Sequence, residues 1–160
     1  MRKVPSHIRI DAIDRTILTH LQKDGRLSNV QLANLAGLSE SACLRRVRQL
    51  EESGVISGYV MLVDQKNIGK PDNVFVTVTL ESQQREVLNT FESAVMEVPE
   101  VMECYLMSGD SDYLLRVVVR DASDYERIHM QTLTALPGVA RVHSNFALRP
   151  VLKKTEMPIP

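Results

Sequence analysis

The sequence has 160 residues, of which 44% are hydrophobic and 24% are charged, and its formal net charge at pH 7 is −1. This composition is typical of a globular protein and argues against a disordered or fibrous chain. The length suits one medium domain or two small ones, and we expect two. No apolar run approaches the ~20 residues of a membrane-spanning helix, and the first residues carry no secretory signal, so we expect a cytoplasmic protein.

Three short helices are predicted in the first third of the chain. The spacing of isoleucine and leucine predicts a bracing helix over 11–23. Ser28 and Gly37 are placed to cap the two ends of a helix over 29–36. A tight turn then leads into another helix that ends near Ser53. Two helices joined by such a turn, with a third behind them, are typical of a helix-turn-helix DNA-binding domain.

The third of these helices carries three arginines within four residues. At about 100° per residue, Arg45 and Arg48 fall opposite the apolar sector and cannot be core residues, whereas Arg46 lies on the flank. A solvated charged face is the alternative, but the helix-turn-helix context favours contact with phosphates and base edges in the major groove. Arg46 is expected either to clamp a phosphate or to pair with an acid inside the domain. The apolar sector consists of Cys43, Leu44, Val47 and Leu50. The predicted DNA-binding residues are Ser39, Ser41, Arg45, Arg46 and Arg48.

The charge distribution agrees with a DNA-binding front part. Residues 1–60 hold nine Lys and Arg against six Asp and Glu, whereas residues 61–160 hold ten against fourteen. After the third helix, 59–63 reads as a strand that pairs with another copy or packs on the helices, and a linker rich in turn residues follows. The expected organisation is a helix-turn-helix domain over 1–58, a strand and linker over 59–72, and a second domain over 73–160.

The second domain shows a βαββαβ order. Alternating apolar residues predict strands over 74–80, 102–107, 113–119 and 139–148, and helical spacing predicts helices over 84–98 and 121–135. This order is the ferredoxin-like split βαβ, an antiparallel sheet with both helices on one face, so the fold class is α+β. Apolar residues also fall on the other face, at Phe75, Met107, Leu114 and Val118. An open apolar face needs a cover, so we expect a homodimer with two-fold symmetry.

Four segments of the chain together resemble the Lrp/AsnC, or feast/famine, family of prokaryotic transcriptional regulators. They are IDAIDRTILTHLQKDGRLSNVQLANLAGLS, CLRRVRQLEESGVISGYVMLVD, ECYLMSGDSDYLLRVVV and LPGV. The resemblance implies a helix-turn-helix domain followed by a βαββαβ domain, called RAM, that dimerises through its sheets and commonly builds octamers. It further implies double-stranded DNA as a partner and a small effector, usually an amino acid, bound where dimers meet.

The resemblance also implies an effector site around the loop SGDSDYL. Gly109 lets the backbone present N–H groups that suit a carboxylate, and Asp110 or Asp112 could accept a hydrogen bond from an α-ammonium. A plain Gly-Asp hairpin turn is the alternative interpretation. The implied effector-binding residues are Tyr105, Met107, Gly109, Asp110, Asp112, Asn145, Phe146 and Ala147.

Neither catalysis nor cofactor binding is indicated. No nucleophile motif, phosphate-binding loop, dinucleotide-binding pattern or metal-ligand spacing occurs in the sequence, so we expect no enzyme, no metal and no cofactor. Cys43 and Cys104 are both expected to be buried thiols. Two alternatives to a sequence-specific regulator stay open at this point: an architectural protein that organises DNA, and a metabolite-sensing domain without DNA readout.

Overall fold

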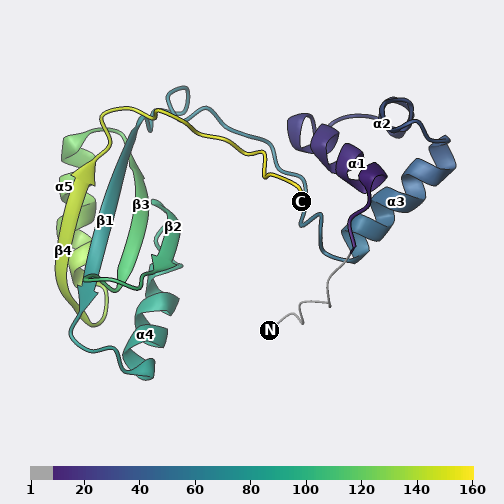
Figure 1. Ribbon diagram of the computed structural model, residues 1–160. Helices are drawn as coiled ribbons and strands as arrows, with labels where there is room; N and C mark the ends of the chain where they lie inside the picture. The colour runs from purple at the N-terminus through teal and green to yellow at the C-terminus, as the bar shows by residue number, and fades with distance from the viewer. Residues whose placement is uncertain (1–8) are drawn as a thin grey trace. The chain divides into compact units, whose positions relative to one another are not determined.

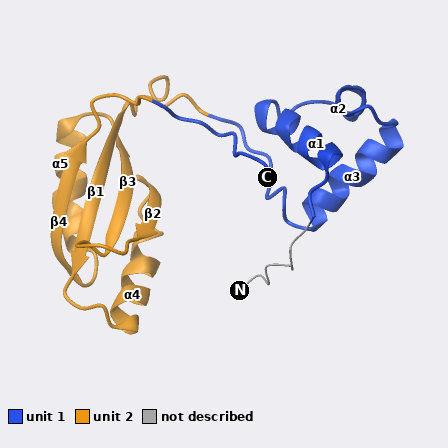
Figure 2. Ribbon diagram, viewed as in Figure 1, with its two compact units in different colours: residues 1–62, 152–160 blue, residues 63–151 orange. Residues whose placement is uncertain are grey.

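The computed structural model describes residues 9–160, which form two compact units. The helical unit contains the residues up to Leu62 together with Leu152–Pro160, and the sheet unit contains Val63–Val151 (Figure 2). The chain therefore passes between the units twice, after Leu62 and after Val151. These division points differ from the boundaries expected from the sequence, chiefly because the last nine residues group with the helices.

The helical unit is built from three capped helices. They are α1 (Ala12–Lys23), α2 (Asn29–Ala36) and α3 (Glu40–Glu52) (Figure 1). The side chains of Asp11, Ser28 and Ser39 each accept a backbone N–H from the first turn that follows, which satisfies donors that the helix itself leaves free. Gly37 ends α2 with φ 65°, a left-handed conformation that favours glycine. The predicted three-helix arrangement is confirmed.

A small apolar cluster holds these helices together. Its buried members are Ile17, Leu18, Leu32, Ala33, Cys43 and Leu50. Leu44 was expected in the same sector but is 41% exposed. At 100° per residue, Leu44 lies about 60° from Val47 around the helix axis, on the side away from Cys43 and Leu50, so it turns out of the packed face. The packed stripe of α3 is therefore narrower than the apolar residues of the sequence suggest.

The expected strand over 59–63 is not formed within this chain. Tyr59 donates its hydroxyl to Glu51 at 3.0 Å, and burial, followed by this hydrogen bond, raises its pKa to about 12. Val60 and Met61, which follow, are each 86% exposed. A strand requires a hydrogen-bonded neighbour, and no described residue provides one for this segment.

The sheet unit follows the expected βαββαβ order. Its elements are β1 (Asp72–Leu80), α4 (Arg85–Val95), β2 (Val101–Leu106), β3 (Tyr113–Val119), α5 (Ala122–Gln131), a 3₁₀ helix η1 (Leu133–Ala135) and β4 (Val139–Phe146). The strands are arranged β2-β3-β1-β4, and neighbouring strands are antiparallel. Both helices end before the predicted residue. Past α4, Glu97 and Val98 donate backbone bonds three residues back, which tightens the chain before Pro99.

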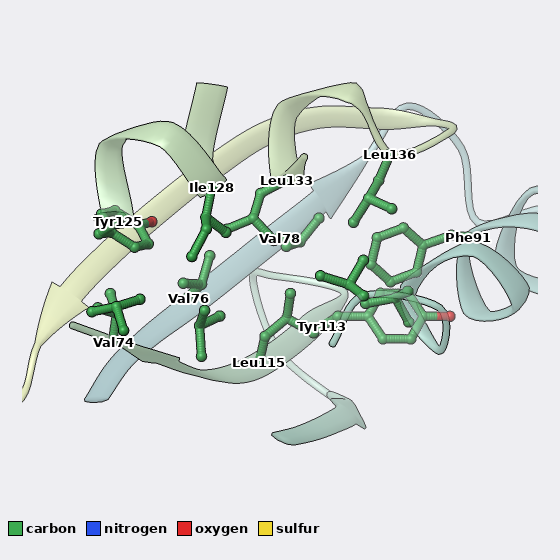
Figure 3. Packing of buried hydrophobic residues seen from close by; sticks show 14 of the residues in the cluster. Val74, Val76, Val78, Phe91, Tyr113, Leu115, Tyr125, Ile128, Leu133 and Leu136 are labelled. Carbon is green, nitrogen blue, oxygen red and sulfur yellow. The ribbon is translucent and has the colours of Figure 1, made fainter. Parts of the chain in front are cut away.

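One face of the sheet packs on both helices. Val74, Val76 and Val78 of β1 are fully buried and point toward the side chains of α4 and α5 (Figure 3). Phe91 of α4 packs on Tyr113 of β3 with ring centroids 4.5 Å apart. This face forms the core of the unit, as the alternation in the sequence predicted.

The opposite face, here called the open face, is not covered by any helix that the structure describes. Phe75 pairs with Arg116 across β1 and β3, and Phe75 and Met107 are 39% and 43% exposed. Val118 is nearly buried at 7% exposed. Cys104 is exposed, contrary to our expectation, because it lies on the edge strand β2, whereas Cys43 is buried as expected.

Candidate DNA-binding and ligand-binding sites

The exposed side of α3 presents two arginines. Arg45 and Arg48 are exposed, and neither forms an ion pair with any residue that the structure describes. Ser41, one turn earlier, lies with its hydroxyl 3.3 Å from that of the N-cap Ser39. A shallow hollow of ≈ 370 Å³ runs along this side, lined by Ser41, Leu44, Arg45, Arg48, Gln49 and Glu52. The hydroxyl of Ser41 and the guanidinium groups of Arg45 and Arg48 are hydrogen-bond donors of the kind that contact phosphate oxygens and base edges.

Arg46 behaves differently from its neighbours in sequence. Its guanidinium donates to Asp11 at 2.7 Å and to Asp14 at 2.8 Å, and its side chain is 26% exposed. The pKa of Asp11 is lowered, first by the backbone N–H of Asp14 and then by the hydrogen bond from Arg46. The same contacts raise the pKa of Arg46. This arginine therefore connects α3 to the start of α1, the second of the two roles that the sequence allowed.

In the sheet unit, the loop between β2 and β3 exposes Gly109 and Asp110. Gly109 does not have a positive φ, and a Cβ added there would meet no atom within 4 Å. The folding of the single chain therefore does not require glycine at this position. Asp110 and Ser111 form one side of a hollow of ≈ 300 Å³ at the end of the open face.

The other side of that hollow comes from β1 and β4. Thr77 pairs with His143 and Thr79 with Arg141 in the antiparallel register, so all four side chains lie on the open face. None of these four residues is among those predicted from the sequence. The period-two pattern that places Val76 and Val78 in the core could have found them, because it puts the intervening threonines on the opposite face.

Asp112 is buried, unlike Asp110 in the same loop. It is 7% exposed, and its carboxylate accepts the backbone N–H of Leu80 at 2.7 Å and the amide of Gln83 at 2.8 Å. Its own N–H donates to the carbonyl of Val78 at 2.9 Å. Asp112 thus holds the loop to the end of β1 and does not line the hollow.

The remaining predicted effector residues are spread over both faces of the sheet. Tyr105 lies on the open face and donates its hydroxyl to Glu103 at 3.1 Å, a contact that raises the pKa of Tyr105. Asn145 is also on the open face, opposite Phe75. Phe146 points to the helix side, where its ring meets that of Tyr125 edge-on at 5.2 Å.

Met107 and Ala147 are the last two residues of the predicted effector set. Met107 is part of the exposed apolar group on the open face, and its N–H donates to the carbonyl of Asp112 at 2.8 Å. Ala147 donates its N–H to the carbonyl of Asn73 at 2.9 Å, just past the end of β4.

Among residues 9–160, no group of His, Cys, Asp and Glu side chains is arranged to hold a metal ion. No helix in the same range is long and apolar enough to cross a membrane.

Both units match known protein families. Residues 10–57 match a winged helix-turn-helix DNA-binding family, and residues 73–157 match the Lrp/AsnC ligand binding domain. The Bkd operon transcriptional regulator of Pseudomonas aeruginosa is 45% identical over 150 residues, which cover 94% of this chain and 98% of that protein. The leucine-responsive regulatory protein of Escherichia coli is 42% identical over 94% of this chain and 92% of its own length.

Solved structures agree with these sequence matches. A transcriptional regulator of Neisseria meningitidis, solved as a complex with L-Met, has a TM-score of 0.89 and 32% identity and covers 94% of this chain and 97% of that one. An AsnC family regulator of Agrobacterium tumefaciens has a TM-score of 0.88 and 40% identity, with 92% and 96% of the two chains covered. These relatives are transcriptional regulators and not enzymes. The chain belongs to the Lrp/AsnC family and is a DNA-binding transcriptional regulator with a C-terminal ligand-binding domain.

Proposed function

We propose that this regulator reads specific DNA sequences through the exposed side of α3. The observation that carries the proposal is the contrast between the arginines. Arg45 and Arg48 are exposed and form no ion pair with the described residues 9–160, whereas Arg46 is held by Asp11 and Asp14. Arg45 and Arg48, with Ser41, contact base edges in the major groove. Ser39 at the N-cap contacts a phosphate, and Arg46 fixes the angle at which α3 is presented.

The second part of the proposal is that a small amino acid binds beside the loop of Gly109 and Asp110. The hollow there combines the carboxylate of Asp110, which can accept from an α-ammonium, with the guanidinium of Arg141, which can bind an α-carboxylate. The Neisseria relative solved with L-Met supports this class of ligand. Tyr105, Met107 and Asn145 extend the same face, and Asp112 holds the loop in place. Phe146 and Ala147 lie toward the other end of β1, beside Val74 and Asn73, and are left out of the proposed site.

The third part is that two copies associate through their open faces. Phe75 and Met107 leave apolar surface exposed there, and Val60 and Met61 add an unpaired apolar segment from the linker. Burial of such surface between identical subunits is the commonest way to cover it. Further association of dimers into an octamer places effector sites where dimers meet, so that an effector acts by favouring one assembly over another.

DNA reading is tested by selecting duplexes from a random library with the full-length protein and then footprinting the selected sequences. We expect two bounded protected half-sites, about one helical turn apart (~34–36 Å) or a multiple of it. Arg45→Ala should weaken binding by about 1 to 3 kcal/mol and relax the preference at one base pair. Continuous protection without preferred sequences would indicate an architectural protein. Failure to bind any duplex at low salt would indicate a metabolite-sensing domain alone.

The effector site is tested by a thermal-shift screen of the twenty common amino acids. A true ligand raises the melting temperature by mass action, and the shift should shrink for Arg141→Ala. Arg149→Ala is a matched control, because Arg149 is exposed and lies outside the hollow. Equal shifts for both variants would rule out the role given to Arg141.

Association is tested by sedimentation velocity. Phe75→Lys places a charge on the open face and should shift the protein toward the monomer. Met96→Lys is the control, because Met96 is an exposed methionine, 75% accessible, that follows α4 rather than lying on the open face. Identical sedimentation of both variants and the wild type would exclude the open face as the interface.

A further inference from the structure

The last residues of the chain are bound to α1 of the helical unit. Gln22 donates its side-chain amide to the carbonyl of Met157 at 3.1 Å and accepts the N–H of Met157 in return. Two turns earlier on α1, Arg15 donates Nε to the carbonyl of Pro160 at 3.0 Å, and its Nη2 donates to the same oxygen. Both ends of the segment 157–160, here called the tail, are therefore held by side chains of one helix.

The dimensions of the tail match the helix surface beneath it. From Arg15 to Gln22, α1 rises about 10 Å at ~1.5 Å per residue, and three extended steps span nearly the same length at ~3.3 Å each. Met157 lies beside Gln22 and Pro160 beside Arg15, so the tail runs antiparallel to α1. Between these two contacts, Ile159 is partly buried and packs against the core cluster of the helices.

Because of the order of segments along the chain, the contact between the tail and α1 adds a second connection between the two units. The tail follows directly on the ligand-binding unit, since β4 ends at Phe146 and the chain re-enters the helical unit at Leu152. With the tail bound, the helical unit is connected to the sheet unit by two segments, the linker and the tail. With the tail released, only the linker remains, and the helical unit has more orientational freedom.

We propose that the tail is a reversible latch that restrains the DNA-binding unit and so strengthens simultaneous binding of two half-sites by a dimer. The inference rests on the proposed function, because it assumes a dimer that reads two half-sites. A restrained pair of DNA-binding units loses less conformational freedom when both engage one duplex, which raises the effective concentration of the second unit. The latch consists of a few exposed hydrogen bonds and one apolar side chain, which suits a contact that opens and closes.

Tail binding itself is tested by hydrogen exchange of the full-length protein without DNA or effector. The N–H of Met157 donates to Gln22 in the bound state, so it should exchange slowly. In Ile159→Asp, which removes the apolar anchor, exchange at this amide should be about tenfold faster. Leu152→Asp is the matched control with the same new charge, because Leu152 is 72% exposed, and it should exchange like the wild type.

The effect on DNA is tested with the duplex selected above and with a shortened duplex that holds one half-site. Ile159→Asp should weaken binding to the two-site duplex by about tenfold and leave binding to the one-site duplex within about twofold of the wild type. Retained one-site binding also shows that the helical unit is folded. Gln22→Glu provides a second variant of the same size, because its carboxylate cannot donate to the Met157 carbonyl, and it should act in the same direction.

Each outcome decides a different point. Fast exchange of the Met157 amide in the wild type would overturn the latch itself. Slow exchange with equal weakening on both duplexes would mean that the tail supports the helical fold and not the pairing of two units. Slow exchange with unchanged binding to both duplexes would also overturn the coupling. If selection yields no preferred duplex, the proposed function fails and the coupling with it, whereas the exchange experiment still reports whether the tail is bound.

Discussion

The guanidinium of Arg46 lies 2.8 Å from the carboxylate of Asp14, across the junction between α3 and α1. One of three clustered arginines is thereby used inside the domain, and the two on either side of it remain available to a partner. The division follows from the helical period, because Arg46 is turned about 100° from Arg45 and faces the start of α1. Three arginines within four residues thus have separable effects on stability and on DNA binding.

Removing Arg46 should reduce stability. Arg46→Ala leaves Asp11 and Asp14 close together without their cation, so we expect the free energy of unfolding in urea to fall by about 1 kcal/mol. Arg45→Ala is the matched control. It should change stability by less than about 0.5 kcal/mol, because Arg45 forms no ion pair within the part of the chain that the structure describes. An equal effect of the two changes on the urea midpoint would contradict the role given to the ion pair.

Substitutions of the two aspartates in the β2–β3 loop should have different effects. Asp112→Ala leaves the buried N–H of Leu80 without its acceptor, and we expect the free energy of unfolding to fall by about 1 to 3 kcal/mol. Asp110→Ala should leave stability nearly unchanged and instead reduce the thermal shift produced by the effector. Chemical unfolding and the ligand screen, run on both variants, check the two halves of this expectation. Loss of stability in Asp110→Ala would contradict it.

Asp124 should make part of the free energy of unfolding depend on pH in the acidic range. The backbone N–H of Arg120, followed by a hydrogen bond from Arg127, lowers its pKa to about 2. A lowered pKa means that the stabilisation is fully present above the unfolded value of about 3.9 and is lost as the pH falls toward 2. The stability difference between the wild type and Asp124→Asn should therefore shrink between pH 5 and pH 2, as measured by urea unfolding at fixed ionic strength. A difference that stays constant over this range would be inconsistent with the assignment.

Gly138 should tolerate no side chain. Its φ is +75°, and an added Cβ would lie 2.7 Å from Cγ1 of Val87 in α4. Gly138→Ala combines the left-handed strain with this clash, so we expect a loss of about 2 to 4 kcal/mol in unfolding free energy. Gly69→Ala isolates the strain, because Gly69 has φ +74° with no atom within 4 Å of the added Cβ, and should cost about 1 kcal/mol. Similar losses in both variants would show that the contact with Val87 is unimportant.

The parts of the fold that could be predicted are those that depend on neighbours in sequence. Ser28 and Gly37 cap α2 at the expected residues, because a cap is a local hydrogen bond or a local φ. The bounds of β3 also agree with the prediction, since its alternation is interrupted at both ends by turn residues. The strand expected at 59–63 does not form within the single chain, because strand pairing depends on a partner that the local sequence does not contain.

The candidate sites were predictable to a smaller extent, for the same reason. The exposure of Arg45 and Arg48 followed from the helical period alone. The burial of Asp112 did not, because it depends on an N–H of Leu80 that lies 32 residues away. The side to which Phe146 points was not predicted either, although the pattern of β4 indicates it. Arg141, His143 and Asn145 alternate with Val142 and Phe146, which places Phe146 on the helix side.

The contact between Ile159 and the helical core has a consequence for synthesis of the protein. The helix-turn-helix region leaves the ribosome early, but Ile159, which packs against its core, is added more than a hundred residues later. Until then, the stripe of α1 between Arg15 and Gln22 stays uncovered in the nascent chain. A truncated fragment that stops after the linker would carry the same uncovered stripe permanently, and would be a poor substitute for the DNA-binding half of the intact regulator.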